Sequence, residues 1–168
     1  MCTDGAFISS FTPAVIEMGD CNFTCKCDDV NNIGAINTTT NWSNLTSTQK
    51  EKRCYSVEGT LVMDENVSFV DKTFIMNGDS KISILDNFVE FESCELKGCE
   101  YLWKGIELTN VNSYLSVHSN TLISDAKSAI SRVRANGTLN VSGARFSNNY
   151  IGISLAHDFL YPNSPNVP

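Results

Sequence analysis

The residues best suited to chemistry form one mixed-charge group in the repeated part of the sequence, namely Asp125, Lys127, Arg132 and Arg134. Such a group could bind a sugar acid. β-Elimination needs a base that removes the proton next to a uronate carboxylate, and glycoside hydrolysis needs two facing carboxylates. The sequence lacks the paired aspartates with Gly-His-Gly and the Arg-x-Pro-x-x-Arg of enzymes that carry out these reactions. We therefore treat the four residues as candidate ligand-binding residues, or as a solvated turn, and expect no catalytic residues.

The histidines and cysteines do not form a recognisable metal or nucleophile motif. His118 and His157 are the only histidines in the sequence, and their spacing predicts neither a triad nor a metal pair. Cysteines at Cys21, Cys25, Cys27 and Cys54 could bind zinc as thiolates. Because they supply only one pair with zinc-like spacing, disulfides are the favoured interpretation. We expect no cofactor and no metal.

Three further residues have two interpretations each. Trp103 could be an exposed platform that stacks on a sugar ring, or a corner residue that packs against the interior. Packing is favoured, although a turn just before Trp103 makes its direction undecidable from strand alternation. Cys94 and Cys99 could close a small disulfide loop or act as small buried fillers, which free cysteines often do.

Composition restricts the class of protein. The chain has 168 residues, of which 42% are hydrophobic, which fits a single domain. A net charge of -7 argues against nucleic acid as a partner, and no apolar run is long enough for membrane insertion. Abundant Asn, Ser and Thr are typical of extracellular β-rich proteins. We expect a secreted or cell-surface protein whose signal peptide is not in this chain.

Short predicted strands position the candidate residues named above. From Tyr55 onward, segments of three or four residues alternate apolar and polar side chains and end in Asn, Asp, Gly or Ser. This pattern predicts an irregular N-terminal cap over residues 1–50, which contains the cysteine cluster. It also predicts β-coils over residues 51–158 and a tail over residues 159–168.

The coils repeat with a period near 24 residues. Residues 114–133 align with residues 138–157, so that Leu115 matches Leu139, Val117 matches Val141, and Leu122 matches Phe146. Ile106, Ile130 and Ile153 each follow a small residue. Without an amphipathic helix in any repeat, this period predicts a parallel β-solenoid in which equivalent side chains stack about 4.8 Å apart. The expected interior ladders are Ile106–Ile130–Ile153, Leu115–Leu139 and Val117–Val141.

The repeat motifs resemble those of right-handed parallel β-helix repeats in secreted bacterial surface proteins, common in the Bacteroidota. The resemblance covers roughly residues 40–158 and includes NWSN at 41–44 and VEGTLVMDENVSF at 57–69. The remaining residues that carry it are Cys99, Trp103, Gly105, Ile106, Leu115, Val117, Asp125, Ala126, Ala129, Ile130, Leu139, Val141, Phe146, Asn148, Asn149, Gly152 and Ile153. It implies a right-handed β-helix, here of about four coils, and a type IX sorting domain that this chain lacks.

These observations predict a non-catalytic extracellular β-helix module with a structural or adhesive role. The alternative is a carbohydrate-binding β-helix, or a carbohydrate-cleaving one similar to polysaccharide lyases. The expected partner is an extracellular polysaccharide or a surface glycan. An uncapped solenoid end after Ile153 also predicts self-association, because its strand edges are open to pairing.

Overall fold

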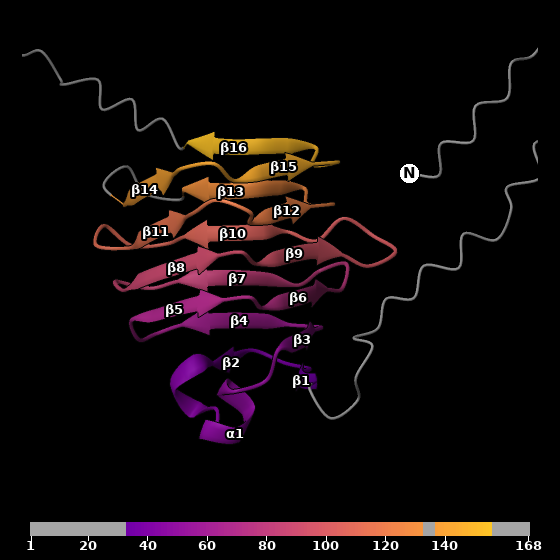
Figure 1. Cartoon of the computed structure of the whole chain (residues 1–168), viewed down its shortest axis with the longest axis vertical. Helices are drawn as coiled ribbons and strands as arrows, with labels where there is room; N and C mark the ends of the chain where they lie inside the picture. The colour runs from indigo at the N-terminus through magenta and orange to yellow at the C-terminus, as the bar shows by residue number, and fades with distance from the viewer. Residues whose placement is uncertain (1–32, 133–136, 156–168) are drawn as a thin grey trace, which may run out of the picture.

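The computed structural model describes residues 33–132 and 137–155, and these residues form an all-β parallel solenoid of about five turns. The strands stack as successive rungs, with α1 at one end and β16 at the other (Figure 1). The predicted fold class is confirmed, with one turn more than the sequence predicts. The cysteine cluster at Cys21, Cys25 and Cys27 lies outside the described residues, as do Arg134 and the predicted tail at 159–168.

Three sheets make up the sides of the solenoid, and the pairing between neighbouring strands within each sheet is parallel. Sheet A contains, in spatial order, β1 (Ile33–Ile36), β3 (Cys54–Val57), β6 (Thr73–Met76), β9 (Glu95–Gly98), β12 (Leu122–Ser124) and β15 (Arg145–Ser147). Sheet B contains β2 (Thr40–Asn41), β4 (Thr60–Met63), β7 (Lys81–Ile84), β10 (Gly105–Leu108), β13 (Ser128–Arg132) and β16 (Ile151–Leu155). Sheet C contains β5 (Val67–Val70), β8 (Phe88–Glu92), β11 (Tyr114–Val117) and β14 (Thr138–Val141).

The core is a set of apolar ladders that run through the coils. The strand register pairs Ile106 with Ile130 and Ile130 with Ile153. It also pairs Leu115 with Leu139 and Val117 with Val141. These are the pairs that the sequence repeat predicts. Side chains alternate between the two faces of each strand, so one apolar position in every two is enough to fill the interior.

One predicted pair is wrong by a residue. Phe146 pairs with Ile123, while Leu122 pairs with Arg145 on the outer face. The turn from Val117 to Ile123 is one residue longer than the equivalent turn from Val141 to Phe146. Since a shift of one residue moves a side chain to the opposite face, Ile123 is fully buried and Leu122 is partly exposed.

The described part of the solenoid begins at β1, upstream of the boundary that the sequence pattern places at residue 50. The first coil is interrupted by a 3₁₀ helix, η2 (Trp42–Asn44), and by one turn of α-helix, α1 (Ser47–Lys50), which hide its strand pattern. Trp42 is 3% exposed and contacts the rings of Tyr55 and Phe69 edge-on, with centroids 5.7 and 4.9 Å away. Trp42 therefore closes this end of the apolar interior.

Candidate functional site

The outer face of sheet C carries a group of mostly polar and aromatic side chains, all of them at least partly exposed except Ser116, which is 3% exposed. We call this group the sheet C face. Its members are Ser68, Val70, Phe88, Glu90, Glu92, Tyr114, Ser116, Thr138 and Asn140, together with His118, which directly follows β11. Their positions are set by alternation, because the residues between them, such as Phe69, Val89 and Leu115, fill the interior.

An aromatic pair lies at one edge of the sheet C face. The register places Phe88 directly beside Tyr114, and their ring centroids are 5.0 Å apart with planes tilted by 34°. Phe88 is 37% exposed, and its backbone N–H donates to Asn66 Oδ1 at 2.8 Å. Aromatic pairs at this distance attract each other, and the pair presents an apolar surface with a phenol hydroxyl at one edge.

A polar ladder runs beside the aromatic pair, across all four strands of sheet C. Ser68, Glu90, Ser116 and Asn140 occupy equivalent register positions. Ser68 Oγ donates to Glu90 Oε2 at 2.5 Å, and Asn140 Nδ2 donates to Ser116 Oγ at 3.2 Å. These bonds fix the rotamers of the ladder residues, so their remaining donors and acceptors have defined directions.

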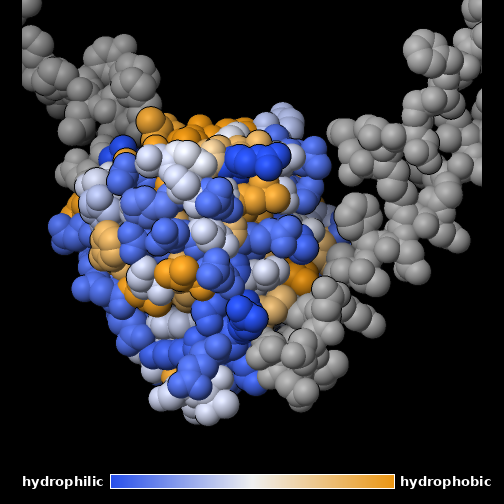
Figure 2. Space-filling view, in the orientation of Figure 1, coloured by the Kyte–Doolittle hydropathy of each residue, from blue (hydrophilic) through white to orange (hydrophobic). Residues whose placement is uncertain are grey.

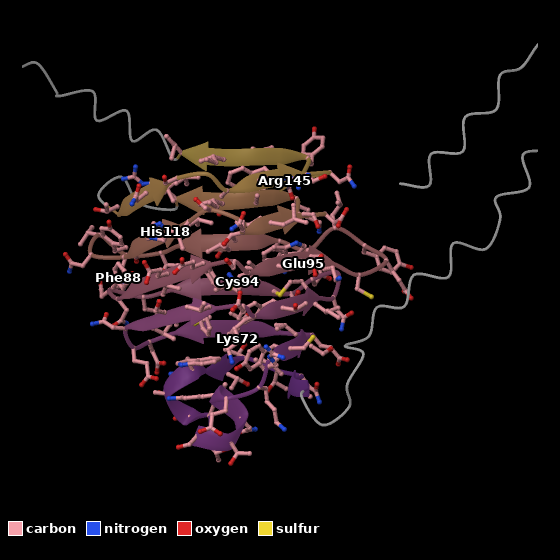
Figure 3. All side chains as sticks on the ribbon, in the orientation of Figure 1. Lys72, Phe88, Cys94, Glu95, His118 and Arg145 are labelled. Atoms are coloured by element: carbon pink, nitrogen blue, oxygen red, sulfur yellow. The ribbon has the colours of Figure 1, made fainter. Side chains whose placement is uncertain are left out.

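His118 follows β11 directly and contacts two residues of the polar ladder. Figure 3 shows it near Phe88, at the left of the molecule. Its Nε2 is 2.8 Å from Glu90 Oε1 and 3.0 Å from Ser116 Oγ. A hydrolytic Ser-His-carboxylate relay divides the two ring nitrogens between the serine and the carboxylate. Here Ser116 and Glu90 share one nitrogen, so the arrangement fixes side chains and does not activate Ser116.

Sequence patterns did not predict the sheet C face. A signal was available, because Phe88 and Tyr114 are separated by 26 residues, the same separation as the core pairs Val89–Leu115 and Phe91–Val117. Only the comparison of outward positions in register would have brought Phe88 beside Tyr114 and Glu90 beside Ser116.

Trp103 lies inside the solenoid. It is fully buried, its indole Nε1 donates to the Ser124 carbonyl at 2.8 Å, and its backbone bridges in parallel to Ala126. A buried indole needs such a hydrogen-bond partner. Of the two interpretations, burial supports packing at the corner between sheets A and B, because no ring face is accessible to a sugar.

The described members of the mixed-charge group, Asp125, Lys127 and Arg132, do not form a compact cluster. Asp125 and Lys127 lie at the corner before β13, whereas Arg132 lies at the far end of β13, about 16 Å away for five extended residues. Asp125 accepts from Ser124 Oγ at 2.8 Å, and Lys127 Nζ is 3.7 Å from Asp79. In the register of sheet B, Arg132 pairs with Leu108 on one side and with Leu155 on the other.

The corner at Asp125 has a structural explanation. Asp125 and Asn148 both have positive φ angles, of 58° and 53°. Asn149 accepts from the Ala126 N–H at 2.8 Å and donates to the Ile123 carbonyl at 2.9 Å, which ties one coil to the next. Asp and Asn tolerate this backbone conformation better than most residues. Asn148 and Asn149 therefore have structural roles at this turn.

Among the described cysteines, Cys94 is free and buried, and its thiol lies 3.4 Å from the Phe69 carbonyl and 3.3 Å from the Glu92 carbonyl. Burial raises the pKa of the Cys94 thiol, which makes it a poor nucleophile. Because Cys94 is a free thiol, the alternative of a disulfide loop between Cys94 and Cys99 is wrong. Cys54 and Cys99 both belong to a small buried cluster around Ile75 on sheet A. Disulfides within the N-terminal cysteine cluster stay a prediction.

Within residues 33–132 and 137–155, no three His, Cys, Asp or Glu side chains lie close enough together to hold a metal ion. No helix in the same described ranges is long and apolar enough to cross a membrane. Comparisons of the chain with protein-family models, curated proteins and solved structures found no match.

Proposed function

We propose that this chain is a non-catalytic extracellular adhesive module that binds a neutral polysaccharide on the sheet C face. The observation that carries the proposal is the aromatic pair Phe88–Tyr114 beside the ladder of Ser68, Glu90, Ser116 and Asn140. A sugar ring has apolar C–H faces and a rim of hydroxyls. An aromatic surface beside fixed hydroxyl, carboxylate and amide groups complements both features.

The solenoid suits this role because it holds the sheet C face rigidly. Strands β5, β8, β11 and β14 are hydrogen-bonded to one another in register, so the ladder residues repeat at intervals of about 4.8 Å. A preorganised surface loses little conformational entropy when it binds an extended chain. A repeating polymer can contact several coils at once.

Charge favours a neutral polymer over a polyuronate. The sheet C face contains Glu90 and Glu92 but neither Lys nor Arg in its described strands. The whole chain has a net charge of -7. An acidic polysaccharide would be repelled over about 8–10 Å at physiological salt, whereas a neutral one would not.

Display outside the cell is part of the proposal. The support is the polar, Asn-, Ser- and Thr-rich composition, together with the resemblance of the coil motifs to bacterial surface β-helix repeats of the Bacteroidota type. Parallel β-solenoids also occur in enzymes, so the fold itself does not choose between adhesion and catalysis.

The test is affinity electrophoresis of the chain against a panel of neutral and acidic polysaccharides, with and without calcium. We expect retardation by at least one neutral polysaccharide and none by polyuronates. The same mixtures are assayed for unsaturated products and for new reducing ends. Release of either product would overturn the non-catalytic role, and retardation by polyuronates alone would overturn the neutral ligand.

A further inference from the structure

The last coil in the described part of the chain has exposed residues on its interior face. Ile106 and Ile130 are fully buried, yet Ile153, the next member of their ladder, is 41% exposed. Ile151 and Leu155 project from the same face of β16 and are 42% and 58% exposed. Figure 2 shows this apolar surface in orange at the upper end of the molecule, where Figure 1 places β16.

Among the described strands, β16 lies at an edge of sheet B and lacks the usual features that prevent an edge strand from pairing. Within the described part of sheet B, β16 is bonded to β13 on one side and to no strand on the other. Its sequence IGISL contains no charge and no proline, which are the usual features that keep an edge strand from pairing with another chain. By contrast, the edge of β15 carries Arg145 and that of β14 is one residue shorter than β16.

We propose that the occupant of this edge is the β16 strand of a second copy of this chain, paired antiparallel about a two-fold axis at Ile153. The opposite end of the solenoid cannot take this place, because Trp42 and α1 close it. Head-to-tail stacking is thereby blocked. The remaining arrangement joins the β16 ends of two copies. A two-fold interface uses the same patch on both copies.

The sequence of β16 is complementary to itself in this arrangement. Antiparallel pairing about Ile153 places Ile153 opposite its own copy and Ile151 opposite Leu155. All three residues lie on the interior face of β16, so the two apolar interiors would become continuous. Gly152 would face Ser154 of the other copy on the outside, where a residue without a side chain and a small hydroxymethyl group leave the strands free to approach.

The experiment measures mass by light scattering at several concentrations of the full chain and of two variants. We expect the wild type to convert from monomer to dimer as its concentration rises. Ile153→Lys should remain monomeric, since two like charges would lie directly opposite each other. Val70→Lys is the matched control, because Val70 is 49% exposed on sheet C, and it should dimerise as the wild type does.

A second measurement on the wild type does not depend on any variant. Hydrogen exchange of the β16 amides should slow at least tenfold between dilute and concentrated samples, while exchange in β2 should not change. A wild type that is monomeric at all concentrations, or one that forms open-ended assemblies larger than a dimer, would refute the proposal. Equal effects of Ile153→Lys and Val70→Lys would refute it too. No glycan is present, so the result is independent of the proposed function.

Discussion

Gly105 shows why a small residue precedes an isoleucine in the middle coil. Its φ is +105°, and a Cβ at this position would lie 1.6 Å from the Ser128 carbonyl oxygen. A β-carbon therefore fits neither the backbone conformation nor the space. The sequence marks three such steps as equivalent, at Gly105, Ala129 and Gly152, but only the structure distinguishes them. A Cβ on Gly152 would meet no atom within 4 Å.

This difference gives a matched pair of variants. We expect Gly105→Ala to lower the free energy of unfolding by at least about 2 kcal/mol, because the strained backbone and the clash with the next coil add together. Gly152→Ala should change it by no more than about 0.5 kcal/mol. Urea unfolding of both variants measures the two values. Equal losses would mean that the close approach at Gly105 does not exist.

The residues that sequence reasoning placed well are those whose role repeats. Ile106, Ile130 and Val117 recur at the coil period, so their inward direction follows from alternation alone. Trp103 occurs in a single coil, directly after a turn, so its direction depends on the corner geometry and not on a repeat. The same limitation applied to Phe88, whose partner Tyr114 is visible only in register.

The elements at the N-terminal end stabilise the solenoid by closing it. α1 begins with a capping box in which Thr46 and Gln49 bond reciprocally. The Tyr55 hydroxyl donates to the Lys50 carbonyl at the end of α1 at 2.7 Å. Asp64 on the next coil accepts from Asn41 Nδ2 and from the backbone N–H and hydroxyl of Ser43. Partial burial opposes the charge of Asp64, but these bonds outweigh burial and lower its pKa.

Because the Tyr55 hydroxyl is buried, we expect the free energy of unfolding to fall at alkaline pH. Burial raises the pKa of Tyr55 to about 12, above its ordinary value of 10.0. The unfolded chain therefore loses this proton at lower pH than the folded chain, so the contribution is intact below pH 10 and is lost as pH rises toward 12. We expect the stability of the wild type relative to Tyr55→Phe to fall by about 2 kcal/mol between pH 9 and 11.5. Urea unfolding of both proteins across this pH range measures the difference in their free energies of unfolding. A difference that stays constant with pH would contradict the raised pKa of Tyr55.

Element boundaries were the least predictable part of the fold from sequence. The turn between β11 and β12 has one residue more than the turn between β14 and β15, and this single residue reverses the faces of Leu122 and Ile123. Both residues are apolar, so composition could not reveal the shift. Likewise, β1 and β2 precede the predicted start of the coils because η2 and α1 separate them from β3.

For the whole molecule, the period near 24 residues was sufficient to predict stacked parallel coils. Such a period repeats one supersecondary unit, and no single coil can satisfy its own backbone hydrogen bonds. The surface was harder to predict than the core, because outward side chains need not repeat to keep the coils together. The period therefore predicts the interior ladders but not the sheet C face, on which the proposed function depends.

The most direct test of that function is calorimetric titration of a neutral oligosaccharide, chosen from the polymers that retard the chain, into two double variants. Phe88→Ala with Tyr114→Ala removes the aromatic pair from the sheet C face. Tyr101→Ala with Tyr150→Ala is the matched control, because Tyr101 and Tyr150 are 72% and 82% exposed at positions outside sheet C. We predict at least a tenfold loss of affinity in the first and wild-type affinity in the second. Wild-type affinity in the first variant would contradict the account.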